Sequence, residues 1–338
     1  MKAVRINKPF EIEVIDMDKP EIDEQNNVLI KMTAAGICGS DVHIYHGTNA
    51  AATYPRVIGH EMVGQVVEVG DNVTKVKPGD RVIVDQVVNC GTCYACKINR
   101  GNVCADLKVR GVHIDGGYRE YIVVPEKDVY FVPDSLTDVE AVMIEPATIA
   151  VQSCSRAELV AEDTLLIFGA GALGSSILKI ARLHTSNIIV ADIVDDKLEA
   201  MKNLGAKYTI NTLKEDLTEK VREYTGGYGV TVSIDAACTS DSLGRLLEAT
   251  GNAGRVITMG FSIDNTPVTQ FKITSKELDI RGSRLQNKKF QGVIDLVNEG
   301  RLNLKDSVSH TYHFTDAQKA FDFIDSKDPS MRKIVLTF

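Results

Sequence analysis

Four of the seven cysteines lie close together in the sequence and have the spacing of metal ligands. Cys90, Cys93, Cys96 and Cys104 are separated by two, two and seven residues. One loop with these spacings can wrap four thiolates around a tetrahedral zinc ion, at Zn–S distances of about 2.3 Å. Because four thiolates leave no open position, such an ion would be structural. Two disulfides or an iron–sulfur cluster are the alternatives, and a reducing compartment disfavours the disulfides.

A second group of residues predicts an open, catalytic zinc site. Cys38, His60 and one carboxylate, from Glu61 or Glu145, would supply three ligands and leave a fourth position for water or substrate. Taken singly, Cys38 could be a small buried residue, and Glu145 could cap a helix before Pro146. The combination of all these residues favours the metal site.

Three polar residues that follow Cys38 fit supporting roles at such a site. The Ser40 hydroxyl could stand beside a substrate hydroxyl, and His43 could pass the proton toward solvent. Asp41 could accept the second ring N–H of His60 and so fix the tautomer of that histidine. This segment therefore predicts a path for a proton beside the metal.

A glycine-rich turn between an expected strand and helix predicts a dinucleotide-binding site. The strand covers 164–168, and Gly169, Gly171 and Gly174 open the helical pattern that follows it. Asp192 ends the next expected strand, where a carboxylate binds ribose hydroxyls and repels a 2′-phosphate, which favours NAD over NADP. An N-cap of the following helix is the alternative role for Asp192. The predicted cofactor residues are Gly169, Gly171, Ala172, Leu173, Gly174, Asp192 and Gly260.

The order of the expected elements predicts an α/β protein in which a dinucleotide-binding domain interrupts a mostly-β domain. Short β-branched segments broken by Gly-Asp and Pro-Gly-Asp turns fill the first third of the chain. Strands then alternate with helices, which indicates a doubly wound parallel sheet, and the last residues again form an expected strand. The predicted boundaries are 1–147 for the first part of the β domain, 148–286 for the Rossmann domain and 287–338 for the rest of the β domain.

Taken in order, these motifs resemble those of the zinc-dependent medium-chain alcohol and polyol dehydrogenases. The segments that carry the resemblance are 38–43, 59–61, the cysteine quartet, 144–146 and 169–174. The similarity extends over essentially the whole chain, and it implies a GroES-like β domain, two zinc ions per chain and NAD. It also implies that the chain transfers hydride from an alcohol to the nicotinamide.

The same resemblance assigns roles residue by residue. It implies Cys38, His60 and Glu145 as ligands of the catalytic zinc, with Glu61 as a second carboxylate that some members exchange onto the metal. Ser40 and His43 match the proton relay, and the cysteine quartet matches the structural zinc site. Ethanol-type members have a second cysteine in place of Glu145, so the glutamate favours polyol-type substrates.

Within the family, five segments are most similar to the bacterial starvation-sensing-type dehydrogenases and the L-galactonate and L-gulonate 5-dehydrogenases. These segments are 54–61, 111–118, 141–146, 234–238 and 283–285. The similarity implies oxidation of the C5 hydroxyl of a hexonate to a keto acid such as fructuronate or tagaturonate. Arg284 is the candidate for the substrate carboxylate and His113 for a sugar hydroxyl. Their alternatives are an ion pair at the rim and a satisfied loop histidine.

Two other functional classes remain open at this point. One is a polyol dehydrogenase of the sorbitol type, or an L-threonine dehydrogenase, with the same architecture. The other is a regulatory protein that keeps the fold and has lost turnover. The intact open site argues against that second class, because loss of function would be expected to change those residues first.

Composition limits the classes of partner. The chain has 338 residues and a formal net charge of −8, which argues against nucleic acid as the main partner. The longest uncharged segment, 164–178, is shorter than the roughly 18 residues that span a bilayer, and the N-terminus has no secretory pattern. We therefore expect a cytoplasmic enzyme for a small molecule, with no membrane partner, and the resemblance suggests a homo-oligomer, either a dimer or a tetramer.

Overall fold

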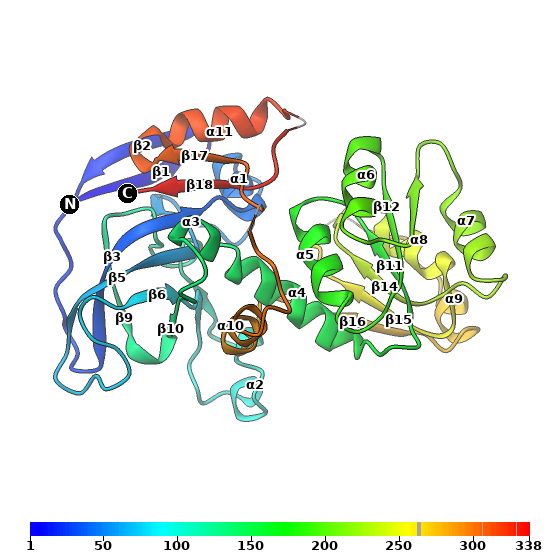
Figure 1. Ribbon diagram of the computed structural model, residues 1–338, viewed down its shortest axis with the longest axis horizontal. Helices are drawn as coiled ribbons and strands as arrows, with labels where there is room; N and C mark the ends of the chain where they lie inside the picture. Colours follow the sequence, from blue (N-terminus) through cyan, green and yellow to red (C-terminus); the bar gives the residue numbers. More distant parts are fainter. Residues whose placement is uncertain (262–264, 306, 329) are drawn as a thin grey trace. The chain divides into compact units, whose positions relative to one another are not determined.

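The first and last parts of the chain fold into one unit, and the middle of the chain forms another. In the computed structural model, which describes residues 1–261, 265–305, 307–328 and 330–338, unit 1 comprises Met1–Pro146 and Phe290–Phe338. Unit 2 comprises Ala147–Lys289. The two segments of unit 1 are joined by a strand pair: β18 (Ile334–Thr337) runs antiparallel to β3 (Asn27–Gly36), and Figure 1 shows the red strand in the same unit as the blue one.

Unit 1 is mostly β structure and carries one large mixed sheet. The strand order in this sheet is β10-β6-β5-β3-β18-β17, and β9 also pairs with β3. The other strands of unit 1 are β1 (Lys2–Lys8), β2 (Glu11–Asp16), β4 (Arg56–Val57), β5 (Glu61–Val69), β6 (Arg81–Val84), β7 (Val87–Val88), β8 (Lys108–Val109), β9 (Tyr121–Pro125), β10 (Val129–Phe131) and β17 (His310–His313). Its helices are α1 (Gly39–Tyr45), α2 (Tyr94–Lys97), α3 (Asp138–Ala141), α10 (Phe290–Asn298) and α11 (Ala317–Asp325).

Alternating apolar residues on neighbouring strands explain the core of unit 1. Val28, Ile30 and Met32 on β3 are buried and pack with residues of β5 and β6 such as Met62 and Val82. Side chains at every second position of a strand share one face, so this spacing places the apolar groups on the inner face of the sheet. The sheet is therefore a rigid base for the loops at its ends.

Unit 2 is a six-stranded parallel sheet of the Rossmann type. Its strand order is β13-β12-β11-β14-β15-β16, and every pairing is parallel. Its elements are β11 (Thr164–Phe168), α5 (Ala172–Ala181), β12 (Asn187–Asp192), α6 (Asp195–Asn203), β13 (Tyr208–Asn211), α7 (Leu217–Tyr224), β14 (Val230–Asp235), α8 (Ser242–Ala249), β15 (Thr250–Thr258), α9 (Gln270–Thr274) and β16 (Asp279–Gly282). The remaining helix, α4 (Ile144–Ala157), runs across the boundary between the units. This architecture confirms the predicted fold class.

Strand β13, helix α7 and the short helix α9 of unit 2 have no counterpart in the sequence-based expectation. Strand β13 is an edge strand of four residues, of which only the last two are buried. Helix α7 is highly charged, but Leu217 and Val221, four residues apart, form its buried face, and the Asp216 side chain accepts a hydrogen bond from the Glu219 amide. The N-cap and the four-residue spacing are the signals by which α7 could have been found.

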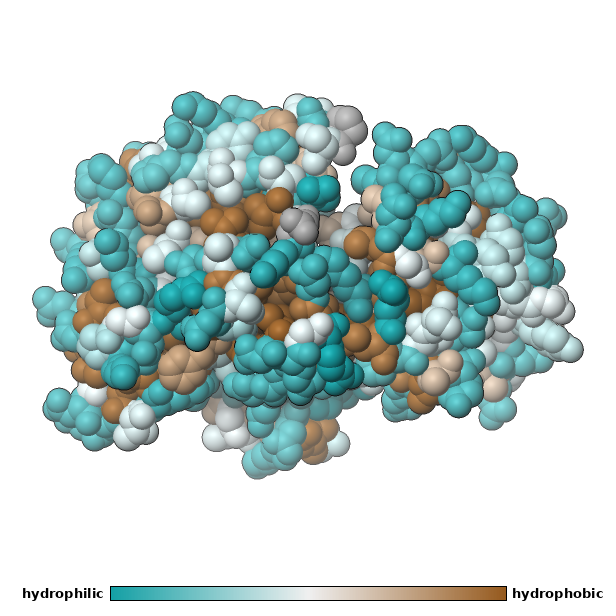
Figure 2. Space-filling view, in the orientation of Figure 1, coloured by the Kyte–Doolittle hydropathy of each residue, from teal (hydrophilic) through white to brown (hydrophobic). Residues whose placement is uncertain are grey.

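No helix in the described ranges has both the length and the apolar character needed to cross a membrane. The face shown in Figure 2 carries polar residues over most of its area, with apolar residues in smaller patches between them.

Candidate active site

The residues predicted for the open metal site come together at one end of the large sheet in unit 1. Cys38 follows β3 and precedes α1, while His60 and Glu61 lie where β5 begins. Strands β3 and β5 pair so that Gly36 is directly opposite Glu61. One ligand atom from each of Cys38, His60 and Glu61 lies within 4.8 Å of the others, so strand pairing has gathered a thiol, an imidazole and a carboxylate.

The Glu61 carboxylate is held by a residue from the other end of the chain. Lys333, just before β18, donates a hydrogen bond to Glu61 Oε1 at 2.5 Å, and both side chains are buried. Glu61 Oε2 is buried without a hydrogen-bond partner among the described residues. A Cβ on Gly36 would come within 1.8 Å of this oxygen, so the carboxylate fits only because residue 36 has no side chain.

The second carboxylate, Glu145, lies outside the group of three ligand atoms. The buried Gln86 amide donates a hydrogen bond to Glu145 Oε1 at 2.5 Å. Burial raises the pKa of Glu145 well above its usual value, and the negative groups Glu61 and Cys38 act in the same direction. In this structure the gathered carboxylate is therefore Glu61, while Glu145 is a buried neighbour that an amide holds in place. Direct ligation by Glu145 stays a prediction.

Asp41 and Tyr118 hold the backbone around these ligands. The Cys38 backbone N–H donates to Asp41 Oδ2 at 2.9 Å, and the Tyr118 hydroxyl donates to the Gly36 carbonyl at 2.9 Å. Asp41 Oδ1 lies 3.5 Å from His60 Nδ1, so the Asp41 carboxylate faces the imidazole ring of His60. The Tyr118 ring packs against Gly59, where a Cβ would come within 2.2 Å of the ring.

The electrostatics of this group fit a divalent cation. Burial alone would raise the pKa of the Cys38 thiol, but the neighbouring His60 overcomes burial and lowers it below the usual value. Burial opposes a positive charge on His60, yet the Asp41 carboxylate and the Cys38 thiolate raise the pKa of His60 well above its usual value. Protein charges therefore favour positive charge where the three ligand atoms meet. Together with the unpartnered Glu61 Oε2, this donor set suits zinc.

The two residues predicted for proton transfer lie on the same short helix. Ser40 is half-buried in the first turn of α1, and His43 is exposed three residues later, so their side chains lie on one face of the helix. His43 Nδ1 lies 2.8 Å from the Thr48 hydroxyl. The two side chains therefore extend from the half-buried Ser40 to the exposed His43, which is the direction that a proton relay to solvent needs. The relay itself stays a prediction.

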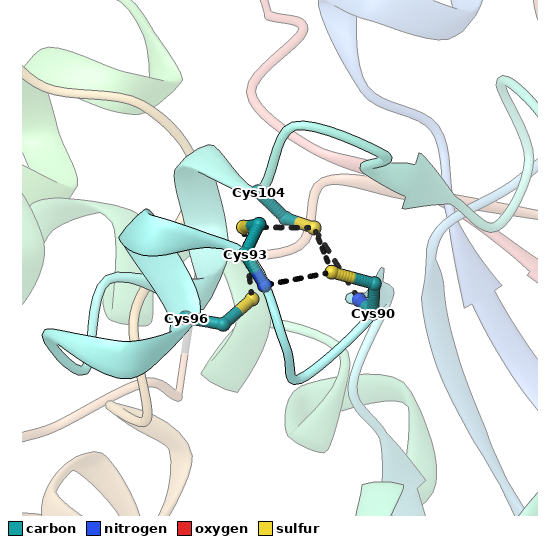
Figure 3. A group of neighbouring side chains, drawn as sticks. All are labelled: Cys90, Cys93, Cys96 and Cys104. Atoms are coloured by element: carbon teal, nitrogen blue, oxygen red, sulfur yellow. Dashed lines mark hydrogen bonds between the residues drawn. The ribbon is translucent and has the colours of Figure 1, made fainter.

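The cysteine quartet forms the second metal group, and Figure 3 shows its four thiols turned toward one another. The Sγ atom of Cys93 lies 3.6 Å from that of Cys96 and 3.8 Å from that of Cys104, and Cys104 lies 3.4 Å from Cys90. Four sulfurs bound at about 2.3 Å to one tetrahedral ion would be roughly 3.8 Å apart. The Thr92 hydroxyl and nearby backbone amides lower the pKa of Cys90 to about 6, which favours the thiolate that zinc binds.

We expect Cys93→Ser to reduce the zinc content from two ions per chain to one and to lower the thermal midpoint by several degrees. We expect the metal to stabilise this segment, because α2 is a single turn with no buried residue. Metal analysis and thermal unfolding test this. Alcohol oxidation at 25 °C should persist, because the quartet leaves no position open for substrate. Retention of two zinc ions would contradict the assignment.

The glycine-rich turn and Asp192 are joined in unit 2. Gly169 has φ of +112° at the end of β11, and a Cβ on Gly174 would come within 1.9 Å of the Gly169 carbonyl oxygen, so both positions need glycine. Asp192 Oδ2 accepts a hydrogen bond from the Ala170 amide at 2.7 Å, and Oδ1 accepts one from the Ile193 amide at 2.8 Å. The acidic side chain is therefore fixed beside the turn before any dinucleotide binds.

The remaining predicted residues lie at separate places. Arg284 follows β16, with its guanidinium carbon 5.5 Å from the centre of the exposed Phe261 ring, and Gly260 follows β15 close to Cys238. Both are at the carboxyl ends of parallel strands in unit 2, where such folds bind ligands. His113 is in a loop of unit 1, and its Nδ1 accepts a hydrogen bond from the Val109 amide at 3.1 Å.

Three residues of this site were missed by the sequence analysis. Lys333 and Gln86 had no assigned role, because neither belongs to a short ligand motif and each reaches its carboxylate from a distant part of the chain. Tyr118 was noted only as part of a similar segment, although it supports the backbone on both sides of the ligands. The sequence predicts a strand in the last residues, and a lysine at the start of a buried strand is the signal that could have pointed to Lys333.

Comparison with known families decides the class of the protein. The family model described as "Alcohol dehydrogenase GroES-like domain" matches residues 24–134, and the one described as "Zinc-binding dehydrogenase" matches 172–299. The chain is 40% identical to the starvation-sensing protein RspB of Escherichia coli K12, over 100% of this chain and 99% of that protein. The chain belongs to the zinc-dependent medium-chain dehydrogenases. It is therefore a zinc- and NAD(P)-dependent alcohol dehydrogenase.

Other relatives span several substrates. The chain is 32% identical to the sorbitol dehydrogenase of Bacillus subtilis, over 95% of this chain and 93% of that enzyme. A crystal structure of the alcohol dehydrogenase rspB from E. coli CFT073, complexed with NADH, has a TM-score of 0.95 and 40% identity and covers 100% of this chain and 99% of that one. Membership of the family confirms the predicted enzyme class. Because the relatives are named for different substrates, they do not determine the substrate of this chain.

Proposed function

We propose that this dehydrogenase oxidises a secondary alcohol of a hexonate, at C5, with NAD as the hydride acceptor. The observation that carries the class of reaction is the group formed by Cys38, His60 and Glu61, which suits one zinc ion and keeps a coordination position for a substrate. The observation that supports an acidic substrate is Arg284 at the carboxyl end of β16 in the dinucleotide-binding unit.

Different residues of the chain have different roles in the proposed reaction. A bound zinc ion supplies a Lewis acid that lowers the pKa of a nearby hydroxyl. Ser40 Oγ accepts the hydroxyl proton while passing its own proton on toward His43, which lies one helical turn further, is exposed and releases a proton to solvent. Asp41 holds the Cys38 backbone and faces His60, and so keeps two ligands oriented. Unit 2 binds the dinucleotide through the turn at Gly169.

The cofactor preference leads to a first test. Asp192→Asn keeps the size of the side chain but removes the charge that repels a 2′-phosphate and binds ribose hydroxyls. We expect kcat/KM with NAD to fall about tenfold. The ratio of kcat/KM with NAD to kcat/KM with NADP should fall by more than tenfold, because the variant no longer repels a 2′-phosphate. Steady-state kinetics with both cofactors measure this. Asp196→Asn, an exposed aspartate in α6, is the matched control and should change neither value. An unchanged preference in Asp192→Asn would contradict the role.

The substrate class leads to a second test. A screen of NAD reduction against hexonates, polyols and L-threonine should respond to L-gulonate or L-galactonate. Arg284→Ala should raise KM for the acid about tenfold or more, with less effect on kcat, because a guanidinium–carboxylate pair is lost. Arg281→Ala is the control, since Arg281 pairs instead with Glu158 and Asp279, each at 2.9 Å. A response to polyols alone would reject the hexonate.

A polyol or L-threonine dehydrogenase is the second candidate, and the relatives of those names favour it. All of these enzymes share the metal ligands, so only the substrate screen separates them. We also propose a cytoplasmic homo-oligomer, since free thiolates for zinc need a reducing compartment. Size-exclusion chromatography with light scattering measures the oligomeric state.

A further inference from the structure

A buried asparagine joins the two turns that follow β12 and β13. Asn211 is the last residue of β13 and lies directly opposite Asp192, the last residue of β12. Its side-chain amide donates hydrogen bonds to Asp195 Oδ1 at 2.6 Å and to the Ile193 carbonyl at 3.4 Å. Its side-chain oxygen accepts one from the Leu213 amide at 3.0 Å. The two turns beside Asp192 are therefore held in one arrangement.

The second oxygen of Asp195 binds a lysine at the same place. The Lys214 ammonium donates a hydrogen bond to Asp195 Oδ2 at 2.6 Å, and the Lys214 backbone N–H donates to the Asn211 carbonyl at 3.0 Å. Both side chains of the ion pair are well exposed, 64% for Lys214 and 61% for Asp195. An exposed ion pair adds little to the stability of a fold, so its removal should leave the protein folded.

The place of this ion pair bears on the choice between NAD and NADP. The two cofactors differ by a phosphate at the 2′ position of the adenosine ribose, whose hydroxyls a carboxylate such as Asp192 binds at this point of the fold. Neighbouring strands of a sheet are about 4.8 Å apart, so Asn211, which anchors Asp195, lies next to Asp192. A 2′-phosphate would therefore approach the Asp195 carboxylate and the Lys214 ammonium together.

We propose that Asp195 is a second specificity-determining residue for NAD, which acts by occupying Lys214. The Asp195 carboxylate adds a negative charge near a 2′-phosphate, and it also binds the ammonium that would otherwise pair with that phosphate. Asn211 keeps Asp195 in this position. The proposal deepens the proposed function and rests on its preference for NAD. It does not depend on which alcohol is oxidised.

Removing the charge of Asp195 should favour NADP in two ways. In Asp195→Asn the repulsion of a 2′-phosphate decreases, and Lys214 is released to pair with it. Lysine binds phosphate as a point charge, and its flexible stem lets the ammonium turn from one anion to a neighbouring one. We expect NADPH to bind about tenfold more tightly to Asp195→Asn than to the natural protein, while the affinity for NADH changes by less than about twofold.

Fluorescence titration of the full-length protein with NADPH and with NADH measures both affinities without turnover, and circular dichroism verifies folding. Asp195→Glu keeps the charge and should retain the natural affinity for NADPH. Asp196→Asn removes the same charge from the next residue of α6 and is the matched control for the general effect of charge. It should leave NADPH binding unchanged. Unchanged NADPH binding by Asp195→Asn overturns the proposal, and so does an equal gain in Asp196→Asn.

A double-mutant cycle tests the released lysine. In the Asp195→Asn background, Lys214→Met should reverse most of the gain in NADPH affinity. Full retention of the gain would assign it to another cation, such as Lys197 in α6, or to reduced repulsion alone, and would overturn the role of Lys214. If the natural protein bound NADPH as tightly as NADH, the proposed preference for NAD would fail, whereas the differences among these variants would still decide the role of Asp195.

Discussion

Cys38→Ser should lower the turnover number about 10³-fold or more, the order of effect seen when a main electrostatic stabiliser is removed. Serine has nearly the same size, but its hydroxyl is not ionised at neutral pH and is a poor zinc ligand. Zinc content should fall from two ions per chain to one, because the cysteine quartet is a separate group in the structure. Kinetics and metal analysis on one preparation measure both effects.

Binding of NADH should survive this change, since the Gly169 turn and Asp192 lie in unit 2. Fluorescence titration with NADH tests this. Cys154→Ala is the matched control: Cys154 is buried in α4 and belongs to neither metal group. It should keep both zinc ions and its turnover. If Cys38→Ser kept its rate, the metal mechanism would be wrong.

Gly36→Ala should disrupt the catalytic metal group although it replaces none of the ligand residues. The new methyl carbon would meet Glu61 Oε2 at 1.8 Å and Val142 at 2.6 Å. The backbone at Gly36 does not have positive φ, so the effect is steric alone. Displacing the carboxylate should weaken zinc binding by about 10- to 100-fold, and the overpacked core should lose about 1–3 kcal/mol of stability. Chelator competition and denaturant unfolding measure these two effects.

Gly39→Ala offers a close control. It lies three residues further along the chain, and a Cβ there would have no atom within 4 Å. We expect it to retain zinc affinity and stability, so that a loss in Gly36→Ala alone points to the space beside Glu61. Equal zinc affinity in both alanine variants would show that the carboxylate at position 61 is not needed by the metal.

The fold was predictable where local pattern and tertiary structure agree. The strand at 164–168 and its glycine turn follow from a run of apolar residues, because a parallel strand is buried on both faces. Strand β13 was not found, since an edge strand needs little apolar sequence.

The metal groups were predictable for a different reason. Ligand chemistry restricts the residue types and their spacing, so Cys38, His60 and the quartet stand out in a sequence. The choice between Glu61 and Glu145 was not predictable, because it depends on which carboxylate the fold turns toward the other ligands. Lys333 and Gln86, which hold the two carboxylates, are brought to them by sheet pairing and loop packing, and no spacing rule reports such contacts.

A segment that follows unit 2 in the sequence completes unit 1, and this sets the order in which the two metal groups can form during synthesis. Lys333 and Glu61 are 272 residues apart, and β18 must pair with β3 before they can meet. A nascent chain on the ribosome already holds the complete quartet and later the complete Rossmann sheet, long before β18 emerges. The quartet can therefore take up zinc early, whereas the catalytic group reaches its final geometry only after β18 has been made and has paired with β3.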